Sequence, residues 1–167
     1  MPTPEPSGVA RPAVARPAVA RPVVVFDGDC GLCNGFVAWL IRHDPEATFL
    51  IAGSAGEAGQ AALAAMGLPA QVAESTLVVA TANGPALRSD AVLTVLAGLG
   101  RPWRVAAATG RAVPRVWRDR LYRFVAARRP RSAAEDAACG TPPAALVTAW
   151  RARLASADDV AALSATR

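Results

Sequence analysis

The chain has 167 residues, which leaves room for one domain of ordinary size and a tail, but not for a second full domain. It is 53% hydrophobic and 19% charged, and no apolar run approaches the roughly 18 residues that cross a bilayer. Fibrous, membrane-spanning and wholly disordered classes are therefore excluded, and we expect a soluble protein without a membrane span.

The net charge of +5 comes from one stretch of the chain. All eighteen basic side chains are arginine, so mechanisms that need a catalytic lysine are excluded. Residues 101–131 hold ten arginines against Asp119 alone, whereas residues 1–100 and 132–167 are each slightly acidic. The block is either the solvated face of a helix, which is the commoner case, or a site for nucleic acid, anionic lipid or an acidic protein.

Proline and arginine dominate the start of the chain. Residues 10–24 read Ala-Arg-Pro-Ala-Val twice and then Ala-Arg-Pro-Val-Val, and each proline removes a backbone donor. We therefore expect residues 1–22 to be a disordered Pro/Arg/Ala-rich tail and residues 23–167 to form the folded domain. The prolines also interrupt the apolar core of any signal peptide, and three cysteines are too few for a secreted disulfide scaffold. A cytoplasmic location is the expectation.

The first predicted elements are a strand, a tight turn and a helix. Val23 to Phe26 is a short, continuously apolar run, as in a buried parallel strand. Asp27-Gly28 is a turn signal, and the apolar spacing then changes to three and four until Asp44-Pro45.

Further along, composition and turn signals predict a strand, a helix, a hairpin and another helix. Their expected ranges are a strand at 47–52, a helix at 55–66, a strand at 76–80, a turn at Asn83-Gly84, a strand at 86–88 and a helix from Ser89 or Asp90 to Ala97. This order of elements predicts an α/β fold, a thioredoxin-like open sheet flanked by helices.

The rest of the chain is predicted to add C-terminal helices. An apolar stripe on the arginine-rich segment starts near Pro114, and weaker patterns follow at 143–154 and 158–163. The stripe consists of Val113, Val116, Trp117, Leu121 and Phe124. We expect Trp103, Trp117 and Tyr122 to pack in the core and between helices rather than to stack on bases.

Cys30 and Cys33 form a Cys-x-x-Cys motif directly after the first predicted strand and turn. Cys30 lies at or near the start of the helix and Cys33 one turn later on the same face, so the two side chains can close a disulfide. The partial positive charge of a helix N-terminus stabilises a thiolate. We therefore expect Cys30 to attack and Cys33, lying deeper, to resolve the mixed disulfide. Half of a metal site and a chance pair in a buried turn are the alternatives.

Two carboxylates flank this motif. Asp27, at the end of the strand, has two candidate roles, which are to accept the proton of Cys33 during resolution or to cap the turn. Asp29, next to Cys30, opposes the thiolate and offsets part of the effect of the helix end.

The spacing of Asp27, Cys30 and Cys33 resembles the Asp-x-x-Cys-x-x-Cys motif of the DCC family of thiol-disulfide oxidoreductases. The likeness extends over residues 23 to 143. Similar elements occur in the same order: residues 39–44, Gly84 with 89–91, 99–103, 113–115, Arg118-Asp119, Tyr122, and Cys139 with Pro142. The resemblance implies a thioredoxin-like fold and dithiol-disulfide exchange through Cys30 and Cys33.

Two positions depart from the related patterns. Family members usually have Asn-Arg-Tyr near the end of the basic helix, whereas this chain has Arg128-Arg129-Pro130, which predicts a shorter helix. Thioredoxins proper have a cis-proline just before the third strand, where this chain has Ser75-Thr76. The loop that clamps a substrate backbone in thioredoxins is thus altered.

Three further residues have functional and structural alternatives. Ser89 either caps its helix or contributes to a carboxylate site at the helix N-terminus. Cys139 is either a small buried residue or a relay for the disulfide. His43, the only histidine, lies at a helix C-terminus, and we expect no catalytic use of it.

Two rival classes remain. Asp27-x-Asp29 after an apolar strand also resembles the opening motif of haloacid-dehalogenase-type phosphatases, but the lysine of that chemistry is absent and Asp158-Asp159 falls in a predicted surface helix. The second rival is a non-catalytic metal- or anion-binding module. It would use Cys30, Cys33, Cys139 and His43 as metal ligands, or the arginine block on nucleic acid.

We therefore predict a cytoplasmic thiol-disulfide oxidoreductase with Cys30, Cys33 and Asp27 as catalytic residues, without a metal and without a bound cofactor. Its partners would be a disulfide-containing protein or small thiol substrate and a separate, unidentified thiol electron donor, and we do not expect nucleic acid. The sequence leaves open the direction of electron flow and the oligomeric state.

Overall fold

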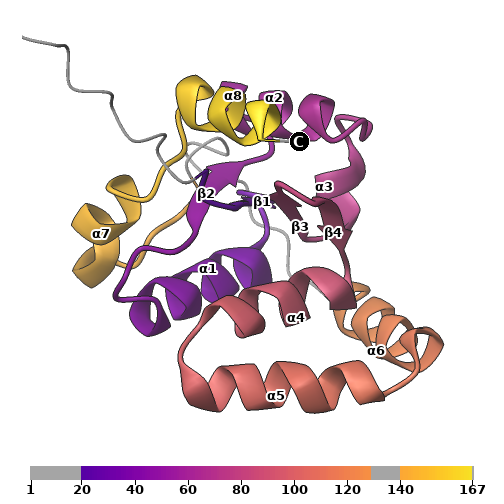
Figure 1. Ribbon diagram of the computed structural model, residues 1–167. Helices are drawn as coiled ribbons and strands as arrows, with labels where there is room; N and C mark the ends of the chain where they lie inside the picture. Colours follow the sequence, from indigo (N-terminus) through magenta and orange to yellow (C-terminus); the bar gives the residue numbers. More distant parts are fainter. Residues whose placement is uncertain (1–19, 129–139, 167) are drawn as a thin grey trace, which may run out of the picture.

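A mixed four-stranded sheet lies at the centre of the computed structural model, which describes residues 20–128 and 140–166 (Figure 1). The strand order is β2-β1-β3-β4, with β1 parallel to β2 and antiparallel to β3, and β3 antiparallel to β4. The strands are β1 (Val23–Phe26), β2 (Leu50–Gly53), β3 (Val78–Thr81) and β4 (Gly84–Leu87). The predicted α/β thioredoxin-like arrangement is confirmed.

The central strand β1 is buried along its whole length, as its apolar run predicted. Val24 pairs in register with Ile51 on one side and with Val79 on the other. Because side chains alternate along a strand, Val24 and Phe26 point to one face of the sheet and Val23 and Val25 to the other. Each face therefore needs its own helical cover.

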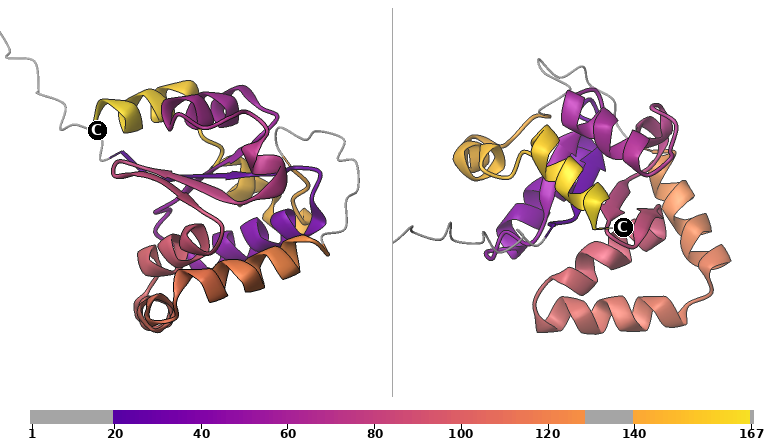
Figure 2. Two further views of the ribbon diagram at one scale, coloured as in Figure 1. Left: turned by 90° about the vertical axis from the view of Figure 1, so that its right-hand side faces the viewer. Right: turned by 45° about the horizontal axis from the view of Figure 1, so that its top comes forward.

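Helices cover both faces (Figure 2). The strand face with Val24 and Phe26 packs beneath α1 and α4, and α2 and α8 cover the opposite face. The helix bounds are α1 (Gly31–His43), α2 (Glu57–Ala65), α3 (Val72–Ser75), α4 (Ser89–Gly98), α5 (Arg101–Ala112), α6 (Arg115–Ala126), α7 (Val147–Arg151) and α8 (Ala157–Ala165). Among the described residues, none of these helices is long and apolar enough to cross a membrane.

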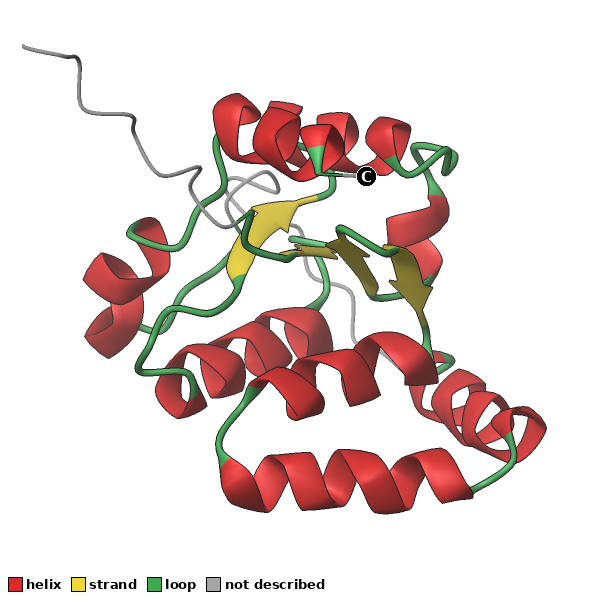
Figure 3. Cartoon of the chain, in the orientation of Figure 1, coloured by secondary structure: helices red, strands yellow, loops and turns green. Residues whose placement is uncertain are grey.

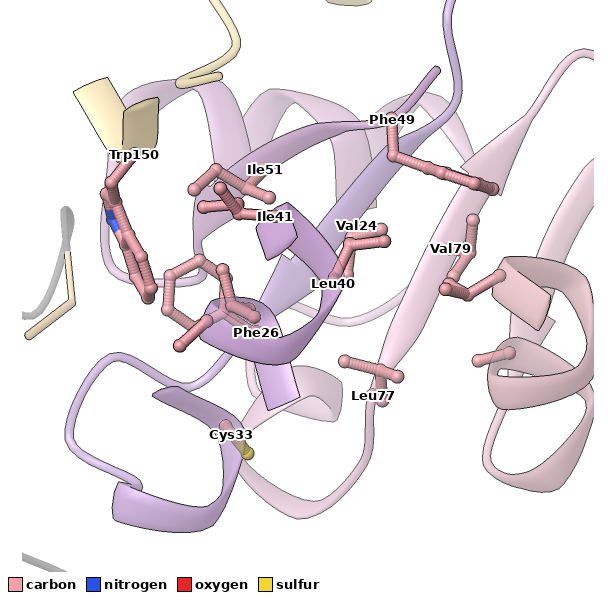
Figure 4. Packing of buried hydrophobic residues seen from close by; sticks show 14 of the residues in the cluster. Val24, Phe26, Cys33, Leu40, Ile41, Phe49, Ile51, Leu77, Val79 and Trp150 are labelled. Atoms are coloured by element: carbon pink, nitrogen blue, oxygen red, sulfur yellow. The ribbon is translucent and has the colours of Figure 1, made fainter. Parts of the chain in front are cut away.

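The larger buried cluster lies between the sheet, α1, α4 and α7 (Figure 4). Trp150 of α7 meets Phe26 edge to face, with ring centroids 5.8 Å apart. Cys33 lies at the margin of this cluster rather than in its middle (Figure 4). The first turn of α1 therefore packs against the edge of the core.

A buried ion pair joins the end of α1 to the C-terminal part of the chain. Arg153 Nη1 lies 2.7 Å from Asp44 Oδ2, and both side chains are buried. Next to it, the N–H of Ile51 donates to the carbonyl of Arg153 at 2.8 Å, so the segment after α7 extends the sheet beyond β2. Burial raises the pKa of Asp44, but hydrogen bonds from the N–H groups of Phe49 and Thr48 and from Arg153 outweigh it, and the pKa lies below its usual value.

Several predicted boundaries are wrong, for local reasons. The second strand begins at Leu50 rather than at 47, because Ala47 has a φ of 56° and the Asp44 carboxylate accepts the N–H groups of the loop that follows. The hairpin turns at residues 82–83, and Gly84, with a φ of 112°, is the first residue of β4. The predicted helix 143–154 is a short 3-10 turn followed by α7.

The arginine-rich segment holds two helices rather than one. The helix predicted near Pro114 is α6, which ends at Ala126, consistent with the shortening expected there. Before it, α5 packs on the outer side of α4, and the sequence pattern did not predict it (Figure 1). Of the predicted tail, residues 1–19 lie outside the described residues.

The expected packing of the aromatic residues is confirmed for two and wrong for one. Trp103 and Tyr122 pack against the core cluster. Trp117 is 65% exposed, because it lies on the wall of an open groove beside α1 rather than in the core.

Candidate functional site

A strand, a turn and a helix position the two cysteines. β1 ends at Phe26, residues 27–29 form the turn, and Cys30 is the N-cap residue of α1 with extended backbone geometry (φ −98°, ψ 110°). The first turns of a helix have N–H groups without a partner inside the helix, so an acceptor at the N-cap satisfies one of them. The predicted position of Cys30 at the start of the helix is confirmed. Figure 3 distinguishes the strands, loops and helices of the chain by colour.

The Cys30 sulfur is the acceptor at this helix end. Its Sγ accepts a hydrogen bond from the N–H of Cys33 at 3.3 Å, and the carbonyl of Cys30 accepts the N–H of Asn34 at 2.9 Å. The partial positive charge of the helix N-terminus favours negative charge on an atom in this position. Both cysteines carry thiols in this structure.

Burial differs from the expectation for Cys33. The exposed fraction is 1% for Cys30 and 7% for Cys33, so the prediction that Cys33 lies deeper is wrong. The difference arises because the first turn of α1 directs Cys33 toward an apolar groove, whereas Cys30 is enclosed by the turn. Cys33 therefore contributes to the wall of the groove, and Cys30 does not.

Hydrogen bonds hold the turn that carries Cys30. The N–H of Asp29 donates to Asp27 Oδ1 at 3.0 Å, and the N–H of Cys30 donates to the Asp27 carbonyl at 3.2 Å. The Asn34 amide group donates to the carbonyl of Gly28 at 2.8 Å, which ties the helix back to the turn. Of the two candidate roles of Asp27, the structure therefore shows the turn-capping one, and proton transfer stays a prediction.

Asp27 and Cys33 lie beside different cavities. Asp27 borders a polar cavity of about 310 Å³ together with Ser54, Gln60 and Glu74. Cys33 lines an apolar groove of about 590 Å³. The two cavities share no lining residue, so Asp27 and Cys33 have different surroundings.

The apolar groove is formed by residues that are far apart in sequence. α1 contributes Leu32, Cys33 and Phe36, the residue before β3 contributes Leu77, and α4, the end of α5 and α6 form the remaining walls. Its volume lies in the range of about 300–1,000 Å³ that is typical of ligand sites, and such sites are mostly apolar. The sequence signalled the apolar stripe of α6 but not its position beside Cys33.

Tyr122 of α6 contacts the loop before β3. Its hydroxyl accepts the N–H of Leu77 at 2.7 Å and the hydroxyl of Thr76 at 3.3 Å. In thioredoxins this loop clamps the substrate backbone, and here its N–H is already used within the chain. In this chain the loop therefore makes an internal contact through the N–H of Leu77.

A polar cluster attaches α6 to the start of α4. The Ser89 hydroxyl donates to Asp119, and Arg118 and Arg115 form ion pairs with Asp90 at 2.7 and 3.1 Å. Burial raises the pKa of Asp119, but the hydrogen bonds from Ser89 and the nearby Arg115 lower it more, so the pKa lies below its usual value. Ser89 thus has a structural role in this cluster.

The other predicted candidates lie away from the dithiol. His43 is at the opposite end of α1, where it stacks on Trp39 and meets Trp103 edge to face, with ring centroids 4.7 and 5.3 Å away. Cys139 lies outside the described residues. Asp159, of the Asp158-Asp159 pair, caps α8 together with Ser156, which is a structural role. Within the described part of the chain, three or more potential metal-binding side chains do not gather at any point.

Comparisons with known proteins agree with this geometry. The model of a family described as DCC1-like thiol-disulfide oxidoreductase matches residues 24–134. The chain is also 34% identical over 107 residues to YuxK, an uncharacterized protein of Bacillus subtilis (strain 168), an alignment that covers 64% of this chain and 77% of YuxK. No solved structure gives a significant match.

Proposed function

Because the chain belongs to the DCC1-like thiol-disulfide oxidoreductase family, we propose that Cys30 and Cys33 are its reactive couple. The substrates would be disulfide-containing proteins or small thiols. The observation that carries the proposal is the hydrogen bond from the Cys33 N–H to Cys30 Sγ at the first turn of α1. That contact holds the two cysteines one helical turn apart, with the N-cap sulfur in the most favourable position for a thiolate.

In the proposed reaction, the Cys30 thiolate attacks one sulfur of a substrate disulfide. A mixed disulfide forms, and the other substrate sulfur leaves as a thiolate that takes up a proton. Cys33 then loses its proton and attacks Cys30 Sγ, which releases the second substrate thiol and leaves a Cys30–Cys33 disulfide. Two electrons pass to the substrate, and a separate thiol donor returns them to the protein.

Asp27 is the proposed proton acceptor for Cys33, either directly or through water. Its buried carboxylate lies in the turn directly before the dithiol, which supports this role.

No metal and no bound cofactor enter this reaction, since the exchange needs only thiols and disulfides. A reducing, cytoplasmic location is part of the proposal, because it would supply the thiol donor. The rival phosphatase and metal-module classes receive no support from the site.

Trapping of mixed disulfides tests which cysteine attacks. We expect Cys33→Ser to accumulate a mixed disulfide with a model disulfide such as insulin, and Cys30→Ser to lose disulfide reductase activity. The control is the double variant, which accumulates no adduct at either position. Full activity of Cys30→Ser, or trapping by Cys30→Ser alone, would show that Cys33 on the groove wall is the nucleophile.

A pair of substitutions separates the two roles of Asp27. Asp27→Asn keeps a carbonyl oxygen for the N–H of Asp29 but removes the base, so we expect slower resolution by about 10²–10⁴-fold with little change in unfolding free energy. Asp27→Ala removes both functions and is expected to lower stability as well. Unchanged resolution in Asp27→Asn would restrict Asp27 to the turn.

A further inference from the structure

Several large apolar side chains of α6 are exposed in the described part of the chain. Val116 is 74% exposed, Trp117 and Leu121 are each 65% exposed, and Phe124 is 56% exposed. At 100° per residue these four side chains fall within one half of the helix, and none of the residues of α6 is buried. A soluble domain rarely presents so many large apolar side chains on one helix without a partner.

Arginines lie within and at the edge of this apolar face: at 100° per residue Arg120 falls between Val116 and Phe124, and Arg123 falls next to Val116. α6 carries four arginines and a single acid, Asp119. Arg115 and Arg118 are engaged in ion pairs with Asp90, so they serve the attachment to α4. Arg120 and Arg123 are exposed, and within the described part of the chain neither forms an ion pair. Positive charge beside the apolar residues is therefore available to an external anion.

The apolar face continues into the groove beside the dithiol. Trp117 and Leu121 line that groove, whereas Val116 and Phe124 do not. A small apolar ligand that filled the groove would leave Val116 and Phe124 in water. The occupant must cover a surface wider than the groove.

We propose that α6 is an interfacial helix that docks this protein on an anionic lipid surface. A short helix with Trp, Phe and Leu on one side and arginines beside them matches the composition of helices that lie in the plane of a membrane interface. Two attractive contributions act together, since the apolar side chains enter the acyl boundary and the arginines meet lipid phosphates. α5 and α6 lie at the outside of the molecule, where a flat surface can reach α6 (Figures 1 and 2).

Charge argues against the other occupants. A symmetric dimer through α6 would bring Arg120 and Arg123 of both copies together, and like charges across an interface are unfavourable. Nucleic acid is held mainly through phosphate contacts, which would leave the four exposed apolar side chains around Arg120 without a role. An anionic bilayer satisfies the apolar and the basic residues at once.

Docking in this orientation would place the groove with Cys33 next to the lipid surface, because Trp117 and Leu121 belong to both. Binding itself uses no thiol. The Cys30→Ser/Cys33→Ser double variant is therefore expected to bind lipid as the wild type does, which separates this proposal from the redox function.

The test uses the full chain with vesicles of phosphatidylcholine alone and of phosphatidylcholine mixed with phosphatidylglycerol. We expect co-sedimentation with the anionic vesicles only, weakened by added salt. Brominated lipids should quench the tryptophan fluorescence of the wild type, and this quenching should be lost in Trp117→Phe.

Substitutions on exposed positions of α6 identify the contact. Leu121→Ser and Phe124→Ser are each expected to weaken binding about tenfold, because each removes a buried apolar side chain from the lipid. Arg120→Gln and Arg123→Gln are each expected to weaken it about fivefold. The matched control is Val105→Ser on α5, an equally exposed valine outside this face, which should bind normally.

Three results would overturn the proposal. Equal or absent binding to the two vesicle types would exclude an anionic lipid surface. If Leu121→Ser and Phe124→Ser leave binding unchanged, the interaction is a nonspecific attraction between charges and not insertion of the apolar side chains. In the absence of lipid, the fluorescence of Trp117 could instead shift when the protein dimerises in sedimentation or when it binds an oligonucleotide. Either result would assign the face to that partner.

Discussion

α1 and α6 carry similar apolar stripes but have opposite environments. In α1 the stripe is covered by the sheet and by α7, and Val37 and Leu40 are fully buried. In α6 no residue is buried, and the largest apolar side chains face outward. Spacing in a sequence thus identifies which side of a helix is apolar, but not whether the same chain covers it.

The connections explain the difference. α1 follows β1 through a three-residue turn whose hydrogen bonds fix the direction of the helix onto the sheet. α6 follows α5, which itself packs on the outside of α4, so α6 is peripheral; Tyr122 joins it to the loop before β3 and the cluster around Asp119 joins it to α4. The dithiol therefore lies on a rigid element, and the proposed lipid contact on a peripheral one.

The largest expected effect contrasts the ion pairs of the two regions. Arg153→Met leaves the buried Asp44 carboxylate without its partner, and we expect a loss of about 3–5 kcal/mol in unfolding free energy. Arg115→Met, in the exposed cluster of α6, should cost no more than about 1 kcal/mol. Urea unfolding of both variants measures the difference, and equal losses would contradict the contrast.

A second pair compares leucines of the two stripes. Leu40→Ala opens a cavity beneath α1, and its unfolding free energy should fall by about 2–5 kcal/mol. Leu121→Ala changes an exposed position and should stay within about 0.5 kcal/mol of the wild type. A cost for Leu121→Ala near that of Leu40→Ala would show that α6 packs against the body in solution.

Tyr122→Phe tests the attachment of α6 to the sheet. The variant leaves the buried N–H of Leu77 without an acceptor, so we expect a loss of about 1–3 kcal/mol. Thermal unfolding checks this value. The freed N–H of Leu77 is a hydrogen-bond donor beside the groove, so turnover of a peptide disulfide should not fall. An unfolding free energy equal to that of the wild type would argue that the Tyr122 hydroxyl does not hold the loop.

The smallest effect is a dependence on acid. The folded-state pKa of Asp44 lies below its ordinary value of 3.8, so the stability it contributes is complete above that value and is lost as the pH falls through the lower folded pKa. Unfolding free energies measured at decreasing pH should drop in this acidic range. Asp44→Asn should show a shallower drop, and an identical slope would exclude Asp44 as the source.

Local features of the fold were predictable, and long-range ones were not. The strand, the turn and the start of α1 follow from neighbouring residues, so Cys30 was placed correctly at the N-cap. The groove, the greater exposure of Cys33 and the internal role of Tyr122 depend on where α6 packs. α5 was missed because its alanine-rich sequence carries few large apolar residues to mark a stripe.

The most direct test of the central claim is a redox titration with peptide mapping of the oxidised protein. Equilibration across thiol-disulfide buffers should give a single two-electron transition, and the oxidised form should contain a Cys30–Cys33 disulfide with Cys139 still alkylatable. Oxidation that links either cysteine only to Cys139, or that leaves both Cys30 and Cys33 alkylatable, would contradict the account.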